Sequence, residues 1–299
     1  MEVRLIWADT RILPYGEEKI DTRYGTSPRD FLHYSTEDIR REFLISSMYI
    51  PDEVTAFYSH IDRMTVLGCM PVTQRVAIDK SLDTRKSFGC SYFLERREIG
   101  VFNIGGEGII TAGDQDYTLE RKDCLYITRG TKHVNFESVC KENPARFYMV
   151  SAPAHTNHET RLITSVQATK RNLGSLENAN KRTINQFIHP DVLQTCQLSM
   201  GLTELETGSV WNTMPVHTHE RRMEIYTYFD ILEGEVVFHL MGQGSETRHI
   251  VIQNYEAAIS PSWSIHSGVG TGSYSFIWAM GGENQEFDDM DPIDTTSLR

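Results

Sequence analysis

The sequence predicts a mainly all-β protein that is built from two β-barrel or jelly-roll domains with a few short helices. Short apolar or alternating runs, each bounded by turn residues, recur along most of the chain without helices between them, as in sandwiches and barrels. At 299 residues the chain is long enough for two cores. The second half weakly repeats the pattern of the first half, as expected for two similar barrels.

The first 45 residues predict an N-terminal extension that carries one short helix. In the stretch STEDIRREFLI, Ser35 or Thr36 can cap a helix, and acidic residues follow in its first turn. Ile39, Phe43 and Leu44 then fall on one helical face. We therefore expect residues 1–45 to precede the barrels as a separate extension.

Residues 46–160 predict the first barrel, and residues 161–299 predict the second. A polar stretch from about residue 156 to residue 181 has the composition of a connection between them. The strand-like runs of the first barrel are TAFYSHI, RMTVLG, SYFLE, IGVFNI, GIITAG, DQDYTL, CLYIT and RFYMVSA. Those of the second barrel are TCQLSMGLTEL, EIYTYF, EVVFHLM, ETRHIVI, AAISP and SYSFIWAM.

Composition excludes several classes of function. The formal net charge is -12, and no basic stripe offsets the 41 acidic residues, which argues against a nucleic-acid partner. The five cysteines form no CxxC pair and are odd in number, so we expect reduced thiols rather than a disulfide framework. No apolar run approaches the roughly 18 residues of a membrane span, and no signal-peptide pattern opens the chain. We therefore expect a cytoplasmic protein that crosses no membrane.

The strongest functional motif is MPVHTHERRMEIY, in which two histidines stand one residue apart. His217 and His219 share a face of a β-strand, whereas in a helix they would diverge. Glu224 follows His219 at an odd spacing, so a turn or bulge must lie within ERRM before the strand EIYTYF begins. His266, in the segment SPSWSIHSGVG, is the third histidine of the set.

Three imidazoles and one carboxylate form a ligand set for a single metal ion. The set suits Zn²⁺ and also iron, manganese, cobalt or nickel. A lone histidine is more often a hydrogen-bonded polar residue, and HTHERR by itself would fit a solvated hairpin. The combination of a strand-spaced pair, a carboxylate after a turn and a distant histidine favours a metal site. It is not a zinc-protease helix, because HERRM has methionine where HExxH requires histidine.

The internal repeat predicts which barrel binds the metal. Each copy has a glutamate and paired arginines before a strand, then a Gly-Glu turn and a turn that ends in histidine. In this alignment Glu98 and His133 match the glutamate and the last histidine of the metal motif, while Ser91 and Phe93 replace the histidine pair. The first copy has thus lost two ligands, and we expect metal in the second barrel alone.

These motifs resemble the two metal-binding motifs of the cupin β-barrels, with Trp263 where many cupins have glycine. The segment ITRGTKH resembles a degenerate second motif in the first half. Longer segments resemble the 5-keto-4-deoxyuronate isomerase family, from about Thr36 to the C-terminus. They are FLERRE, GVFNIGGEG, KRTINQFIHPDVLQTCQLSMGLTEL, WNTMP, HTHERRME, SPSWSIHSGVG and GENQEFDDMD.

The resemblance implies a bicupin whose first barrel is degenerate and metal-free. It implies one Zn²⁺ per chain, with other divalent metals as alternatives, held by His217, His219, Glu224 and His266 in the second barrel. It also implies a cytoplasmic homo-oligomer, a hexamer, whose partner is a small-molecule uronate of bacterial pectin breakdown. The implied reaction is the aldose–ketose isomerisation of 5-dehydro-4-deoxy-D-glucuronate to 3-deoxy-D-glycero-2,5-hexodiulosonate.

Such an isomerisation removes a proton, stabilises an enediolate and returns the proton. A divalent cation polarises the carbonyl and stabilises the developing oxyanion. The sequence does not identify the base that moves the proton. Glu220, Tyr226, His249 and a metal-bound water all stay open.

The carboxylate of the implied substrate requires a cation, ideally an arginine that binds both oxygens. Arg222 and Arg248 are the candidates from the sequence, with plain surface roles as the alternative. Trp263 stands close to a ligand histidine and is a candidate wall of the pocket, with core packing as its alternative.

Two other functions are compatible with the motifs. A non-catalytic sugar-binding cupin would explain the barrels but gives no reason for an intact ligand set in one half. A cupin oxygenase that uses ferrous iron would share the same ligands. The apolar runs FYSHI and RFYMV also predict a homo-oligomer, because exposed apolar strands are aggregation hazards.

Overall fold

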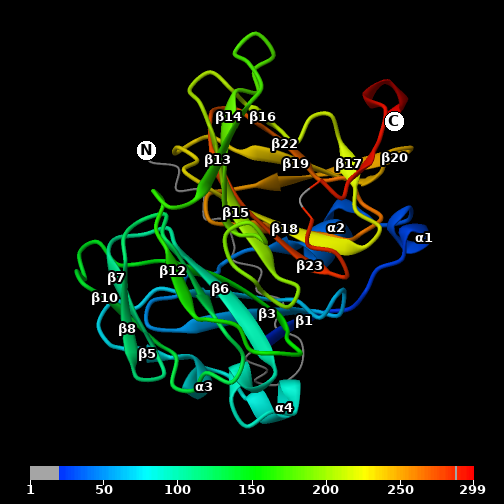
Figure 1. Ribbon diagram of the computed structural model, residues 1–299. Helices are drawn as coiled ribbons and strands as arrows, with labels where there is room; N and C mark the ends of the chain where they lie inside the picture. Colours follow the sequence, from blue (N-terminus) through cyan, green and yellow to red (C-terminus); the bar gives the residue numbers. More distant parts are fainter. Residues whose placement is uncertain (1–19, 287) are drawn as a thin grey trace, which may run out of the picture.

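The structure, a computed structural model that describes residues 20–286 and 288–299, consists of two β-barrels (Figure 1). In each barrel a seven-stranded sheet is combined with a four-stranded sheet. The predicted mainly β fold with a few short helices is confirmed. The part of the predicted extension that precedes Ile20 lies outside the described residues.

The first barrel takes most of its strands from the first half of the chain. The spatial order of its larger sheet is β1 (Ile20–Arg23), β3 (Val54–Ser59), β4 (Thr65–Cys69), β11 (Phe147–Pro153), β6 (Arg97–Asn103), β9 (Cys124–Ile127) and β12 (Arg161–Ile163). The order of its smaller sheet is β5 (Val76–Ala77), β10 (Asn135–Ser138), β7 (Gly108–Ala112) and β8 (Gln115–Leu119).

The second barrel has the same arrangement. The order of its larger sheet is β13 (Thr169–Leu173), β14 (Arg182–Ile188), β15 (Ser199–Leu205), β23 (Ser275–Gly282), β18 (Arg222–Phe229), β21 (Ala257–Ser260) and β2 (Leu44–Ile45). The order of its smaller sheet is β16 (Trp211–Asn212), β22 (Ser267–Gly270), β19 (Val237–Gln243) and β20 (Glu246–Ile252). A separate pair joins β17 (His217–Thr218) to β24 (Asp291–Pro292).

The helical elements are all short. Those in the described residues are α1 (Pro28–Phe31), α2 (Thr36–Phe43), α3 (Ile78–Ser81), α4 (Thr84–Phe88) and two 3-10 turns, Phe93–Glu95 and Thr295–Ser297. The predicted helix is confirmed as α2, which Ser35 caps, but Leu44 lies in β2 and not on the helical face. The Ser35 hydroxyl accepts from the Asp38 N–H at 3.2 Å, and the Asp38 carboxylate accepts from the Ser35 N–H at 2.9 Å.

Strands are exchanged across the predicted boundaries at residues 45 and 160. β1 pairs with β3 of the first barrel, while β2 pairs with β21 of the second. β12, which follows residue 160, pairs with β9 of the first barrel. Figure 1 shows the N-terminal helices α1 and α2 beside the strands of the second barrel. Residues 20–45 thus contribute one strand to each barrel, and Leu44 and Ile45 are buried in the second.

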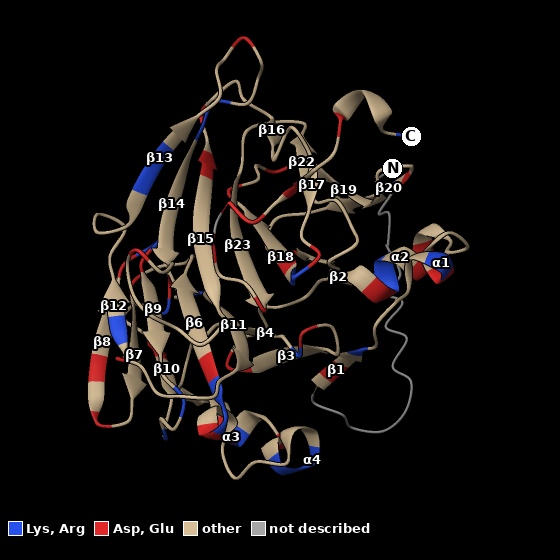
Figure 2. Ribbon diagram, turned by 45° about the vertical axis from the view of Figure 1, so that its right-hand side comes forward, with Lys and Arg blue, Asp and Glu red and all other residues tan. Residues whose placement is uncertain are grey.

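The two seven-stranded sheets pack against each other through one apolar interface. A Cβ at Gly100 of β6 would lie 2.4 Å from the Met200 sulfur of β15, so only glycine permits this approach. The rings of Phe102 and Phe187 meet there at 4.8 Å between centroids. Figure 2 shows charged residues on the helices, in loops and on the outer strands β8, β12 and β13, whereas β23 carries none.

This packing accounts for one of the two apolar runs on which the oligomer expectation rested. The run RFYMV forms β11, which lies between β4 and β6. Phe147, Tyr148, Met149 and Val150 are all fully buried within the chain. Their apolar character is satisfied by the two barrel cores, so it gives no evidence for contacts between subunits.

Candidate metal centre

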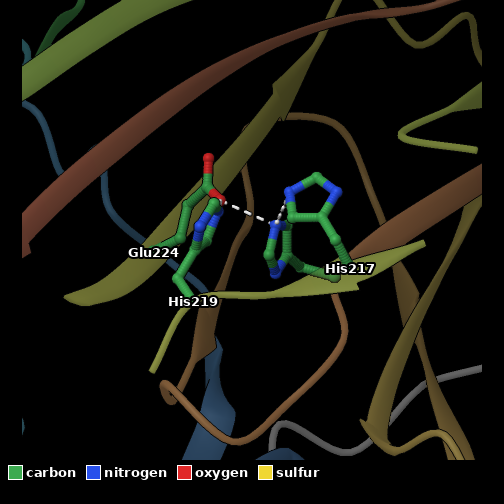
Figure 3. Close-up of side chains that lie close together, drawn as sticks. His217, His219 and Glu224 are labelled. Atoms are coloured by element: carbon green, nitrogen blue, oxygen red, sulfur yellow. Dashed lines mark hydrogen bonds and ion pairs between the residues drawn. The ribbon is translucent and has the colours of Figure 1, made fainter. Parts of the chain in front are cut away.

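Four side chains from separate parts of the second barrel converge at one point. His217 lies on β17, Glu224 lies on β18, and His266 immediately precedes β22. His219 stands at the start of the turn between β17 and β18, where the Arg222 N–H donates to the His219 carbonyl at 3.3 Å. The predicted turn within ERRM is thus present. Figure 3 shows the polar ends of His217, His219 and Glu224 directed toward one another.

The distances fit a single ion. The ligand atoms of the four residues all lie within 4.8 Å of one another. Glu224 Oε2 is 3.1 Å from His219 Nε2 and 2.8 Å from His266 Nε2. The Nε2 atoms of His217 and His266 are 3.1 Å apart. Two ligands about 2.1 Å from a tetrahedral zinc ion lie about 3.4 Å apart, which is close to these separations.

Burial and mutual contacts set the charges of these ligands. Burial raises the pKa of Glu224, but His266 and His219 outweigh it, and the net pKa lies well below the usual range. Burial, together with the neighbouring histidines, lowers the pKa of His217 to about 3. At neutral pH Glu224 is therefore a carboxylate and His217 a neutral imidazole, which are the forms that bind a divalent cation.

Residues 284–286 and 288–292, called the C-terminal segment below, orient the ligands. The carbonyl of Asp289 lies 2.7 Å from His219 Nδ1, so this nitrogen donates to it and Nε2 is left for a metal. Arg221 joins the segment to the turn by ion pairs with Asp289 at 2.7 Å and with Asp291 at 2.9 Å. β24 also pairs with β17, the strand of His217. Hydrogen bonds to residues near the end of the chain thus hold the ligand strand in place.

The ligand cluster lies at the wall of a cavity of about 340 Å³. His217, His219 and Glu224 line this cavity. Its walls are mainly apolar, and the wall residues are Leu173, Ile184, Met214, Pro215, Val216, Phe276, Trp278, Met280, Met290 and Pro292. The further polar residues that line it are Arg182, Thr203, Thr213 and Tyr226. Apolar walls with few polar groups are typical of small-molecule sites.

The hydroxyls of Tyr226 and Thr213 lie 2.8 Å apart in this cavity. Burial raises the pKa of Tyr226 well above its ordinary value, so its hydroxyl stays protonated at neutral pH. The two other residues considered for proton transfer lie elsewhere. Glu220 is exposed in the turn, and His249 is exposed on β20.

The structure does not place Arg222 in the cavity, although the sequence argument put it there. Its side chain is almost completely buried. Its guanidinium donates to the backbone carbonyls of Asn284 at 3.2 Å, Glu286 at 2.8 Å and Asp289 at 3.2 Å. Arg222 shares a strand face with Glu224, but it stands at the end of β18, where the C-terminal segment covers it. Its role is to fix that segment.

Arg248 and Trp263 also lie outside the cavity. Arg248 on β20 forms an ion pair with Glu246 at 2.6 Å, which is the plain surface role. The Trp263 indole N–H donates to the carbonyl of Thr26 at 3.2 Å, and its ring packs on Phe31 with centroids 5.2 Å apart. Trp263 therefore supports the packing of α1 on the second barrel.

The strand register corrects the internal repeat by one residue. In the second barrel Glu224 lies opposite Ser260 of β21. In the first barrel Ile99 lies opposite Ile127 of β9. Ile127 precedes His133 by as many residues as Ser260 precedes His266. Ile99 and not Glu98 is thus the counterpart of Glu224. A slip of one residue moves a strand side chain to the opposite face of its sheet.

Glu98 accordingly faces the interface between the barrels. Its carboxylate accepts from the Tyr126 hydroxyl at 2.8 Å and from the backbone N–H groups of Cys196, Gln197 and Leu198 at 2.8 to 3.0 Å. His133 is exposed. In the portion of the chain that the structure covers, the cluster in the second barrel is the one group of side chains with metal-ligand geometry. No helix among the described residues is long and apolar enough to cross a membrane.

Arg182 and Thr213 are cavity residues that the sequence argument missed. Arg182 stands in KRTINQF, a segment used for the family resemblance, and Thr213 stands in WNTMP. Arg182 is far from the ligands in sequence, and Thr213 is close to His217 but carries no spacing signal. Arg182 lies on β14 of the larger sheet and Thr213 follows β16 of the smaller sheet, so their shared place in the cavity depends on how the two sheets are combined.

Comparison with known proteins agrees with this architecture. A 4-deoxy-L-threo-5-hexosulose-uronate ketol-isomerase of Escherichia coli O127:H6 (strain E2348/69 / EPEC) is 54% identical over 264 residues, which cover 88% of this chain and 94% of that protein. A solved IolB-like protein from Salmonella typhimurium LT2 has a TM-score of 0.60 at 12% identity, over 75% of this chain and 85% of that one.

Another solved structure, of Bacillus subtilis oxalate decarboxylase studied for its Mn(II) centres, has a TM-score of 0.50 at 11% identity, over 75% of this chain and 70% of that one. At such identities these two structures support the fold alone. The KduI/IolB family itself matches residues 73–294. With that match and with 54% identity to a curated relative, the chain belongs to the KduI/IolB family and is a ketol-isomerase of the cupin fold.

Proposed function

We propose that the protein is a metal-dependent ketol-isomerase that converts 5-dehydro-4-deoxy-D-glucuronate into 3-deoxy-D-glycero-2,5-hexodiulosonate during pectin and uronate breakdown. The observation that carries the proposal is the convergence of three imidazoles and one carboxylate at the wall of a cavity of about 340 Å³. The name of the curated relative supports the choice of substrate.

His217, His219, Glu224 and His266 would hold the ion, and we propose Zn²⁺. A divalent cation at this point supplies Lewis acidity, which polarises a carbonyl and stabilises the negative charge that develops on its oxygen. Tyr226 and Thr213 line the same cavity, and their hydroxyls can bind substrate hydroxyls during the proton transfer. The apolar walls exclude water and accommodate the deoxygenated carbon of the substrate.

The proposal predicts one tightly bound zinc ion per chain and turnover of the keto-uronate without oxygen. Elemental analysis of the purified protein measures the metal, and an anaerobic assay on the products of a uronate lyase measures the isomerisation. The double variant His217→Ala, His219→Ala is expected to retain no metal, because two of the four ligands are lost.

Two results would replace this function by the alternatives. Turnover that consumes oxygen with bound iron would identify a ferrous cupin oxygenase. Binding of the uronate by metal-loaded protein with no conversion would identify a non-catalytic sugar-binding cupin. Two tightly bound ions per chain would contradict the assignment of the metal to the second barrel alone.

We also propose a cytoplasmic homo-oligomer, a hexamer, on the basis of the family resemblance. The outer edge strand β13 supports an association, because Leu173 on this strand and Leu176 after it are both exposed. Sedimentation at micromolar concentration is expected to give the mass of a hexamer. A stable monomer under those conditions would contradict the assembly.

A further inference from the structure

Arg182 is the one lysine or arginine among the described residues that line the cavity. It opens β14, where its Cα pairs with Leu173 of β13 and Leu205 of β15. Ile184, two residues further on, lines the same cavity, which is consistent with the alternation of a strand. The sheet thus brings a cation to a mainly apolar space that also contains the ligand cluster.

The charge of Arg182 is not matched by a carboxylate. Its Nη1 donates to the carbonyl of Asn180 at 2.8 Å. Among residues 20–286 and 288–299, no Asp or Glu side chain forms an ion pair with it within 4.0 Å. Arg221 and Arg248, by contrast, both pair with acidic side chains.

Burial lowers the pKa of Arg182 below its ordinary value, with Tyr226 and Tyr274 as smaller opposing influences. An arginine nevertheless stays charged at neutral pH. A half-buried guanidinium in an apolar cavity is stabilised when an anion enters and accepts its hydrogen bonds. The cavity therefore favours a ligand with a negative group at the Arg182 end.

Arg182 and the ligand cluster face the same cavity from different strands, because β15 and β23 lie between β14 and β18, the strand of Glu224. Tyr226 shares a strand face with Glu224. Tyr226 and Arg182 both line the cavity, and they lie close enough for each to influence the pKa of the other. A ligand whose carbonyl lies at the cluster can therefore extend past Tyr226 toward Arg182.

We propose that Arg182 binds the terminal carboxylate of the substrate, so that it selects uronates over neutral sugars and directs the carbonyl end toward the four metal ligands. This inference rests on the proposed function. A guanidinium suits this role because its planar fork can donate to both carboxylate oxygens at once. Thr203, across the register from Ile184, also lines this part of the cavity.

The test compares three variants of the full-length, zinc-loaded enzyme: Arg182→Met, Arg182→Lys and, as a matched control, Arg248→Met. Arg182→Met is expected to raise KM for the keto-uronate by about 10- to 100-fold, the loss that corresponds to charge-assisted hydrogen bonds. Arg182→Lys is expected to lie between this variant and the wild type. Arg248→Met should keep wild-type KM, because Arg248 lies outside the cavity.

Inhibition by two linear six-carbon compounds gives a second readout. D-Gluconate carries a carboxylate, and D-glucitol is its neutral counterpart. We expect the wild type to prefer gluconate by at least about tenfold, and Arg182→Met to abolish the preference while glucitol binds as before. Zinc content and Tm show whether the variant is folded. If Arg182→Met loses stability, the KM of Arg182→Lys decides the question.

The two proposals fail in different ways. A wild-type enzyme that does not isomerise the keto-uronate refutes the proposed function. A wild type that isomerises it, with unchanged KM and unchanged gluconate preference in Arg182→Met, refutes the role of Arg182 alone. A fall in kcat without any change in KM or in inhibition refutes it as well, because the carboxylate contact would be lost in the ground state too.

Discussion

Glu224→Gln is expected to release the zinc ion and to lower kcat/KM for isomerisation by about 10³-fold or more. An amide is a much poorer partner for a divalent cation than a carboxylate. Loss of several kcal/mol of charge stabilisation in the transition state, at about 1.4 kcal/mol for each factor of ten, gives a decrease of this size. Zinc per chain and steady-state kinetics, measured on the same preparation, check the prediction.

Glu220→Gln is the matched control for this change. Glu220 lies in the turn just before β18, but it is exposed and does not line the cavity. We expect it to keep its zinc and its activity. A Glu224→Gln enzyme that retains one zinc ion and full activity would remove Glu224 from the ligand set.

Arg222→Met is expected to lower the free energy of unfolding by about 3 kcal/mol or more, because it removes charged hydrogen bonds from a buried site. The carbonyls of Asn284, Glu286 and Asp289 lose the guanidinium that now binds them. Asp289 also accepts from His219, so zinc affinity should fall by about 10- to 100-fold. Urea unfolding and competition with a chelator measure the two effects.

Arg248→Met is the comparison for Arg222→Met, because Arg248 pairs with Glu246 on a partly exposed strand. Such pairs contribute about 0 to 1 kcal/mol, so its stability should change little. The KM of Arg222→Met, measured with saturating zinc, is expected to stay near that of the wild type. A raised KM with unchanged stability would return Arg222 to the substrate site.

The side chains of the candidate metal centre could be predicted from the sequence because their signals are local. The alternation of a strand places His217 and His219 on one face, and the spacing to Glu224 requires the turn that the structure contains. Only the distant His266 depended on an analogy between motifs. Its Nε2 lies 2.8 Å from Glu224 and completes the cluster.

The proposed substrate cation could not be predicted in this way. Arg222 and Arg248 were the candidates from the sequence, but the first is covered by the C-terminal segment and the second lies on a different sheet from Glu224. Arg182 reaches the cavity because β14 lies three strands from β18. That order is a property of the long-range topology, which residue spacing does not reveal.

The fold class was predicted correctly, whereas the alignment of the two barrels was one residue off. Glu98 directly follows its paired arginines, whereas Met223 separates Glu224 from its own pair, and the register accordingly assigns the matching position to Ile99. Glu98 and Ile99 are both buried, so burial does not show which of them matches Glu224. Glu98 is buried because four donors surround its carboxylate between the barrels.

The position of β2 governs how the molecule can be assembled on the ribosome. β2 is synthesised long before β21, its only partner strand in the described chain. The first barrel can therefore be complete while the larger sheet of the second barrel is still unfinished and its edge strand β2 is still unpaired. Closing so long a loop costs little more than closing a shorter one, since the entropy grows only with the logarithm of its length. The halves are nevertheless not interchangeable modules, because a break between the barrels would leave β2 on the wrong fragment.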